Sequence, residues 1–157
     1  MNLELFKNVD VTFYYGDVTT ACQMINDVID FAVSFHKEHK YKLKIALKPK
    51  RNLDDKTINP KYIDFINQTK LRYDNFSILS RETELHTISH PKTIFISRPY
   101  TSIAKLVSLL GSKSLFYDPT EDLIDIPLFL TDIEFSSGMA DLNSRMTDAF
   151  LDVRGQS

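Results

Sequence analysis

The sequence predicts an α/β domain with a doubly wound, mostly parallel sheet and helices on both of its faces, as in Rossmann-like folds. Three observations support this class. Short runs rich in β-branched and aromatic residues alternate with longer runs of helical periodicity between residues 11 and 118, which is the pattern of repeated strand-helix-strand units. The expected strands are only four to six residues long. The chain has 157 residues, 43% of them hydrophobic and 25% charged, which suits a globular unit with a sizeable core.

The first expected strand is VTFYY at residues 11–15, and Gly16 and Asp17 end it. β-Branched and aromatic residues of this kind favour strands. A long helix follows from Thr19, and its apolar residues fall on one stripe: Ala21, Ile25, Val28, Ile29 and Ala32. This spacing is typical of a helix that covers a core with one face.

Two more strands and a second helix are expected in the next part of the chain. In KLKIALKP, residues 42–49, alternate apolar side chains share one face, and the final proline closes the strand. Asn59 followed by a proline is an N-cap with proline at the first helical position. A helix is therefore expected to start there and to run toward Lys70. The third strand is FSIL at residues 76–79.

The order then repeats twice more. A weak helical pattern at residues 82–89 precedes the strand TIFIS at residues 93–97. The helix expected at residues 101–110 is nearly apolar all round, which indicates that it is well buried. Gly111 is its expected C-cap, and SLFY at residues 114–117 is the fifth strand.

The C-terminal part of the chain has a looser pattern. Residues 121–135 are acidic and apolar without a clear period. An amphipathic helix is expected after Ser136 or Ser137, with one apolar stripe that should dock on the domain or on a neighbour: Met139, Leu142, Met146 and Phe150. We therefore expect a Rossmann-like, nucleotide-sugar-binding domain at residues 1–125 and a C-terminal extension at residues 126–157.

Composition and charge exclude several classes of function. The formal net charge is -2 with no general basic field, which argues against bulk nucleic-acid binding. No apolar run approaches the roughly 18 residues that cross a bilayer. The N-terminal residues lack the apolar centre of a signal peptide, and the lone Cys22 cannot form an internal disulfide. We therefore expect a cytoplasmic protein without a transmembrane segment.

Metal-binding and nucleophile motifs are missing from the sequence. The four histidines lack the spacing of a metal site with a carboxylate partner: His36, His39, His86 and His90. The G-x-S-x-G pattern of a nucleophile elbow does not occur. We expect neither a metal ion nor a cofactor, and the sequence identifies no catalytic residue.

The segments that follow the expected strands are the candidate ligand sites, because ligands of doubly wound sheets lie beyond the carboxyl ends of the strands. The second strand ends in LKPKR, where Lys48, Lys50 and Arg51 lie close together in a chain with no excess of positive charge. Lysine and arginine bind phosphate as a point charge and as a planar fork. The segment therefore predicts an anion clamp, and the alternative is a solvated basic loop.

The fourth strand runs into the sequence SRPYTS, residues 97–102, which opens the apolar helix. The first backbone N–H groups of a helix have no partner within it, and the positive end of its dipole suits phosphate. Ser97, Thr101 and Ser102 add hydroxyls, and Arg98 adds a cation. These four residues are predicted to bind a phosphate without a glycine-rich fingerprint. The alternative is an ordinary helix cap.

The fifth strand ends at Asp118, which a proline follows. A carboxylate at a strand end can accept hydrogen bonds from the hydroxyls of a ribose or a sugar. Asp-Pro is also a common opening of a turn. The sequence leaves both roles open.

These segments resemble the C-terminal, donor-binding half of GT-B glycosyltransferases that build bacterial surface polysaccharides such as capsule and lipopolysaccharide. Residues 96–120, ISRPYTSIAKLVSLLGSKSLFYDPT, are similar to a family pattern that reads roughly I-S-x-P-[FY]-T-S, an apolar helix, a glycine and a strand ending in Y-D-P-T. LKPKR and the opening VTFYYGD with its helix carry weaker likenesses. The resemblance covers about residues 10–122, and Arg98 stands where the family pattern often has methionine.

The resemblance implies that this chain binds a nucleotide-activated sugar. It places the donor phosphate at Thr101 and Ser102, donor or leaving-group charge near Lys48, Lys50 and Arg51, and sugar or nucleotide hydroxyls at Asp118. It also implies a transferase that needs no metal in the donor site. The glycan acceptor and the general base would belong to a second Rossmann-like half, on this polypeptide or another. The chain alone would be an incomplete enzyme, held at the inner membrane face through the rest of it.

Three alternatives stay open at this point. The chain can be a non-catalytic α/β module that binds a phosphorylated ligand or a partner protein. It can be a sugar epimerase domain of the same fold. The third is a sialyltransferase-type domain that uses CMP-sugars, since His90-Pro91 echoes the His-Pro motif of such enzymes. Here the motif precedes a strand instead of following one, which argues against this alternative.

Overall fold

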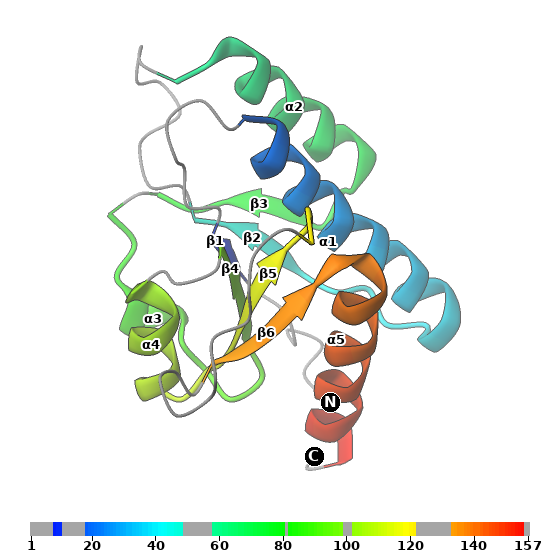
Figure 1. The fold of residues 1–157 in the computed structure, drawn as a ribbon, viewed down its shortest axis with the longest axis vertical. Coiled ribbons are helices and arrows are strands. Elements are labelled where there is room, and N and C mark those ends of the chain that lie inside the picture. Colours follow the sequence, from blue (N-terminus) through cyan, green and yellow to red (C-terminus); the bar gives the residue numbers. More distant parts are fainter. Residues whose placement is uncertain are drawn as a thin grey trace.

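A computed structural model describes residues 8–10, 18–48, 58–80, 82–98, 102–121 and 133–155 of the chain. Its centre is a six-stranded sheet with the order β3-β2-β1-β4-β5-β6 (Figure 1). All five pairs of neighbouring strands are parallel. The strands are β1 (Asn8–Asp10), β2 (Ile45–Leu47), β3 (Phe76–Ile78), β4 (Ile94–Ser97), β5 (Lys113–Asp118) and β6 (Glu134–Ser137). The predicted α/β class with a parallel sheet is thus confirmed.

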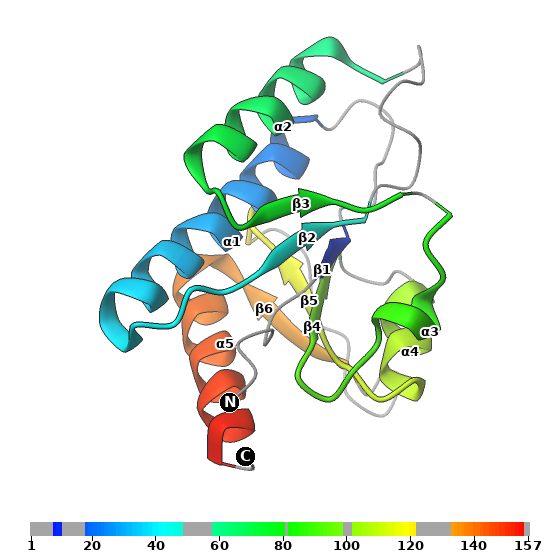
Figure 2. The ribbon, with the colours of Figure 1, turned by 180° about the vertical axis from the view of Figure 1, so that it is seen from behind.

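The helices form a layer on each face of this sheet. Helices α1 (Val18–His39), α2 (Pro60–Arg72) and α5 (Gly138–Gly155) lie on one face, and α3 (Leu85–Ile88) and α4 (Ser102–Leu109) lie on the other (Figures 1 and 2). This distribution follows from the strand order, because the chain moves outward from β1 in one direction and outward from β4 in the other. Right-handed crossovers then place α1 and α2 on the opposite face from α4.

The central strand β1 lies directly before the segment in which the sequence predicts the first strand. The strand expected at residues 11–15 lies outside the described residues, and the strand that pairs with both β2 and β4 is Asn8–Asp10. The other four expected strands are present, with β2 shortened to three residues. β6 was not expected, since residues 121–135 show no strand pattern.

The main core lies between the sheet and the layer formed by α1, α2 and α5. The stripe predicted for α1 is buried there, together with Met24, Phe31 and Phe35. Alternate residues of the strands face the same core: Ile45, Leu47, Ile94, Ile96, Leu115 and Tyr117. A smaller cluster on the other face joins α4 to β5 and β6: Ala104, Phe116, Ile133 and Phe135. This division follows from the two-residue period of a strand.

Helix α5 docks on this main core. Leu142, Met146 and Phe150 are fully buried, and Met139 packs partly against the same cluster. The Phe150 ring lies 5.4 Å from that of Phe35. The C-terminal helix therefore docks on the domain itself, and β6 extends the same sheet. Residues 125 and 126, where a boundary between a domain and an extension was expected, lie outside the described residues.

Helix α4 is less buried than its composition suggests. Ala104 and Val107 are buried, whereas Leu106, Leu109 and Leu110 beyond them are 51%, 72% and 46% exposed. The expectation of burial all round is therefore wrong. An outer helix of a layered α/β fold meets the sheet with one side only, so apolar composition alone does not determine its burial.

The C-terminal end of α4 confirms Gly111 as the predicted cap. Gly111 has a φ of 101°, a backbone conformation that favours glycine. Its N–H donates to the carbonyl of Ser108 at 3.1 Å, and the next N–H, of Ser112, donates to Val107 at 3.0 Å. This pair of bonds is a Schellman motif. It turns the chain directly into β5.

Candidate functional site

The carboxyl ends of the parallel strands lie along one edge of the sheet. The strand register places Asp10 of β1 beside Ser97 of β4, and Val9 beside Leu47 of β2. Lys48, the residue after Leu47, is therefore level with Asp10 and Ser97. The strand order reverses between β1 and β4, and this switch point is where doubly wound sheets bind ligands. We therefore take this edge as the candidate site.

Ser97 is a buried polar residue at the switch point. Its side chain is 1% exposed, and its Oγ has no hydrogen-bond partner among the residues that the structure describes. It alternates with Ile94 and Ile96 of the main core, so it faces the side of the sheet on which α4 lies. A buried hydroxyl without a partner costs about 1–3 kcal/mol. Such a cost is offset when a ligand supplies the partner.

The seam between β4 and α4 has the form that the sequence predicted. β4 ends at Ser97, Arg98 follows as a partly buried residue, and α4 begins at Ser102. Thr101 and the side chain of Ser102 lie outside the described residues. The eight-residue helix α4 directs its N-terminus to the carboxyl edge of the sheet, so its first N–H groups and the positive end of its dipole lie at this edge (Figure 1). The phosphate role of these residues stays a prediction.

The expected anion clamp is described only in part. Lys48 is partly buried at the carboxyl end of β2, and Lys50 and Arg51 lie outside the described residues. Lys48 and Ser97 belong to strands on opposite sides of β1. Lys48 and Ser97 therefore flank β1 from both sides. Their binding of an anion stays a prediction.

Asp118 is the last residue of β5, and its carboxylate forms a turn. The side chain is 1% exposed, and its Oδ1 accepts hydrogen bonds from the backbone N–H of Thr120 at 2.9 Å and from the Thr120 hydroxyl at 2.6 Å. The structure thus shows the turn that the Asp-Pro sequence suggested. A contact from Asp118 to a sugar or nucleotide stays a prediction.

A buried tyrosine supports β5 from the other face of the sheet. The hydroxyl of Tyr117 donates to Oδ2 of Asp27 on α1 at 2.6 Å. Burial raises the pKa of Asp27, while the hydrogen bond from Tyr117 acts in the opposite direction. Burial, followed by the bond to Asp27, raises the pKa of Tyr117. This pair joins α1 to the strand that ends at Asp118, and it is a structural contact below the candidate site.

Asp10 is a residue of this edge that sequence reasoning missed. It ends β1 at the switch point, as the register partner of Ser97. The reason is that Asn8-Val9-Asp10 has a weak strand composition, so the first expected strand began only at residue 11. No local pattern marks a three-residue strand with two polar residues. Only its pairing with strands on both sides places Asp10 at the ligand edge.

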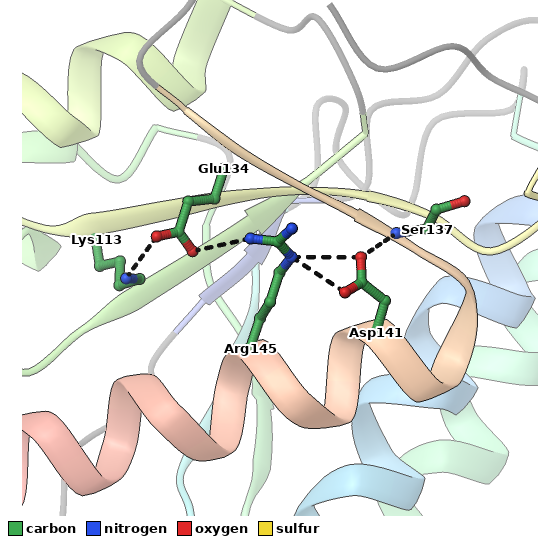
Figure 3. Close-up of polar contacts among 5 residues, drawn as sticks. All are labelled: Lys113, Glu134, Ser137, Asp141 and Arg145. Atoms are coloured by element: carbon green, nitrogen blue, oxygen red, sulfur yellow. Dashed lines mark hydrogen bonds and ion pairs between the residues drawn. The ribbon is translucent and has the colours of Figure 1, made fainter. Parts of the chain in front are cut away.

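A second polar cluster joins α5 to β5 and β6 (Figure 3). Glu134 lies 3.3 Å from Nζ of Lys113 and 3.7 Å from a guanidinium nitrogen of Arg145. Asp141 lies 3.3 Å from Arg145 and also accepts the backbone N–H of Ser137 at 2.9 Å. The two acidic and two basic side chains of this cluster therefore offset one another.

An open groove of about 610 Å³ lies beside this cluster, lined by Lys113, Glu134, Arg145, Asp148, Ala149 and Leu151. Lys113 and Glu134 begin their strands, so the groove lies toward the amino ends of β5 and β6, away from the ligand edge. We interpret the cluster as a set of ion pairs that fixes α5 on the sheet.

His90 lies just before β4, on the amino side of the sheet and away from the ligand edge. Its Nδ1 accepts the backbone N–H of Lys92 at 3.0 Å, so the imidazole belongs to the turn that enters the strand. This position is opposite to the one that a cleft histidine would need. In the part of the chain that the structure describes, no three His, Cys, Asp or Glu residues are grouped as metal ligands.

Comparison with known proteins places the chain in a family. A search of curated proteins gives no match. Among the described residues, no helix is long and apolar enough to cross a membrane. Residues 4–146 match the family described as "Polysaccharide biosynthesis PFTS motif protein". At the seam between β4 and α4, residues 99–102 read PYTS, which differs from PFTS only by a tyrosine in place of phenylalanine. The chain therefore belongs to the family of polysaccharide biosynthesis PFTS motif proteins.

Proposed function

We propose that this chain binds the nucleotide-activated sugar donor of a glycosyltransferase that acts in polysaccharide biosynthesis. The donor's phosphate lies at the seam between β4 and α4 in this proposal. The observation that supports it most is Ser97, a buried hydroxyl without a described partner at the switch point of the sheet. The next residues lead directly to the N-terminus of α4.

The physical basis of this proposal is electrostatic. The first N–H groups of α4 donate to the phosphate oxygens, and the helix dipole places about half a positive charge there. The hydroxyl of Ser97 donates one more hydrogen bond, and Arg98 adds a cation at the end of β4. When the bond between the sugar and the phosphate oxygen of the donor breaks, the leaving nucleotide takes the bonding electrons and gains negative charge. These fixed groups stabilise that developing charge.

The proposal extends to the architecture of the enzyme. The chain is the donor-binding half of a GT-B glycosyltransferase for bacterial capsule or lipopolysaccharide, and a second Rossmann-like half binds the glycan acceptor. In that arrangement the second half also supplies the general base. The charge of the leaving group is offset by Arg98 and the end of α4. No catalytic residue is assigned within this chain.

A thermal-shift screen against CMP, UDP, GDP, ADP and dTDP tests the proposal. A ligand that binds only the folded chain raises its melting temperature by mass action, so we expect a rise with one of these nucleotides. Ser97→Ala should abolish the rise in melting temperature, because it removes a proposed hydrogen-bond donor to the phosphate. Thr101→Ala combined with Ser102→Ala should also abolish it.

Thr93→Val is the matched control. Thr93 lies four residues before Ser97, just before the amino end of β4, so its side chain points to the same face of the sheet. Its Oγ1 is also buried and has no hydrogen-bond partner among the described residues. Both substitutions remove such a hydroxyl, so neither should lower the stability of the free protein. The proposal fails if no nucleotide raises the melting temperature. It fails equally if Ser97→Ala and Thr93→Val have the same effect on the rise.

A further inference from the structure

The carboxyl end of β2 is basic in a chain with a small negative net charge. The sequence has 19 lysine and arginine residues against 21 aspartate and glutamate residues, yet β2 leads into Lys48-Pro49-Lys50-Arg51 without an acidic residue. The structure places Lys48, partly buried, at the ligand edge of the sheet. A partly buried lysine at this edge favours an anionic ligand group.

The position of Lys48 indicates that the anionic group it would bind is distinct from the phosphate at the β4–α4 seam. Lys48 is level with Asp10 and Ser97 in the strand register, and β1 lies between β2 and β4. Neighbouring strands are about 4.8 Å apart, so the backbones of Lys48 and Ser97 are separated by roughly 10 Å. The two positions therefore suit two different parts of an extended ligand.

In folds of this class, the residue type at the end of β2 indicates which ligand group lies there. In dinucleotide-binding sheets an acidic residue in this region accepts hydrogen bonds from ribose hydroxyls, and a basic residue accompanies a ligand with an additional phosphate there. A lysine cannot accept hydrogen bonds from a diol, because the ammonium group only donates. Lys48 can donate to a hydroxyl oxygen, but its positive charge favours an acidic group over an uncharged ribose.

We infer that the ligand of this chain carries a second anionic group, a carboxylate or a phosphate, which Lys48 recognises on the β2 side of the switch point. This inference rests on the proposed function. For a nucleotide sugar, the second group is either the carboxylate of a sugar acid or an additional phosphate on the ribose. The alternative is that Lys48 serves the fold of the chain and not the ligand, and the test separates the two roles.

Binding is measured by calorimetry with pairs of probes that differ by one acidic group. UDP-glucose against UDP-glucuronate, and GDP-mannose against GDP-mannuronate, test a sugar carboxylate. AMP against adenosine 2′,5′-bisphosphate tests a ribose phosphate. We expect the more acidic member of one type of pair to bind roughly fivefold more tightly, the scale of one partly exposed ion pair.

The substitution Lys48→Met should abolish this preference and leave the affinity for the less acidic member nearly unchanged. Lys44→Met is the matched control, because Lys44 is also partly buried but precedes the amino end of β2. It changes the net charge equally and should keep the preference.

Three results overturn the inference while the proposed function stands. The first is equal binding of both members of every pair by the unaltered chain. The second is an equal loss of affinity for both members in Lys48→Met, which would mean that Lys48 contacts the first phosphate. The third is a preference that survives Lys48→Met, in which case the lysine serves the fold and not the ligand. If no probe binds the unaltered chain, the proposed function fails together with the inference.

Discussion

At the scale of single residues, two buried tyrosine hydroxyls donate hydrogen bonds to different kinds of acceptor, one a carboxylate and one a backbone carbonyl. Tyr117 donates to the carboxylate of Asp27 at 2.6 Å, and Tyr73 donates to the backbone carbonyl of Leu43 at 2.6 Å. Burial, with a smaller contribution from Asp74, raises the pKa of Tyr73 to about 12. Both hydroxyls are therefore protonated at neutral pH. The difference lies in the acceptor, because only the bond to Asp27 involves a group that titrates in the acidic range.

We expect Tyr117→Phe to lower the free energy of unfolding by about 1.5–3 kcal/mol at pH 7, the scale of a hydrogen bond to a charged group. At pH 3 the loss should shrink to about 1 kcal/mol, because Asp27 is then neutral. Burial already raises the pKa of Asp27 above its ordinary value of 3.8. The stability that Asp27 contributes is thus fully present below pH 3.8. It is lost as the pH rises through the raised pKa of Asp27 in the folded protein. Removing the bond to Tyr117 raises that pKa further and increases the loss.

Urea unfolding of both proteins at the two pH values measures this effect, and Tyr73→Phe is the control. Its acceptor is a backbone carbonyl, so its loss of about 1 kcal/mol should not depend on pH in this range. An equal loss for Tyr117→Phe at pH 7 and pH 3 would contradict the interpretation of the Asp27 contact.

At the scale of elements, the N-terminus of α5 shows how one side chain fixes a helix on the sheet. Ser137 ends β6 and precedes the helix, and its backbone N–H is bound by Asp141 one turn later. The same carboxylate pairs with Arg145 in the next turn. Gly138 has a φ of 78°, so the chain turns sharply between strand and helix at a position that favours glycine. Figure 3 shows Asp141 between the helix end and the ion pairs that reach β5.

We expect Asp141→Ala to lower the free energy of unfolding by about 1–2 kcal/mol. It removes a capping bond, worth about 1 kcal/mol, and an ion pair between residues four apart, worth about 0.3–0.5 kcal/mol. Chemical denaturation measures the loss. Asp148→Ala removes a carboxylate from the exposed side of the same helix and should change stability by less than about 0.5 kcal/mol. Similar losses in the two variants would show that Asp141 does not cap the helix.

At the scale of the whole molecule, one core connects the first and last helices of the chain. Phe31 and Phe35 of α1 lie 6.1 Å and 5.4 Å from the ring of Phe150 on α5, measured between ring centroids. Both helices pack on the same face of the six-stranded sheet (Figure 2). The C-terminal helix therefore contributes to the core that supports β4 and β5, whose carboxyl ends form the candidate site.

We expect Phe150→Ala to lower the free energy of unfolding by about 3–5 kcal/mol, since it leaves a cavity in a close-packed core. Circular dichroism and tyrosine fluorescence should report one shared unfolding transition for the unaltered chain. Leu151→Ala is the control, because Leu151 is 43% exposed on the neighbouring position of the same helix, and its loss should be below about 1 kcal/mol. Two separate transitions, with Phe150→Ala affecting only one, would show that α5 unfolds independently.

The sequence by itself determined the elements whose signals are local. The apolar stripe of α1, the cap of α2 at Asn59, whose Oδ1 accepts the N–H of Lys61 at 2.9 Å, and the glycine cap after α4 are all present as predicted. Strands β4 and β5 agree with their predicted positions within about one residue. Each signal depends on residues within one or two turns, so it can be read without knowledge of the neighbours.

Only the tertiary structure decided which residues meet at the ligand edge. β1 and β6 are strands because they pair with β2, β4 and β5, and their own compositions do not predict them. The exposure of the leucines of α4 depends on what covers that helix. The level placement of Lys48, Asp10 and Ser97 depends on hydrogen bonds between strands far apart in the chain. Such pairing is non-local, and no periodicity within a short window records it.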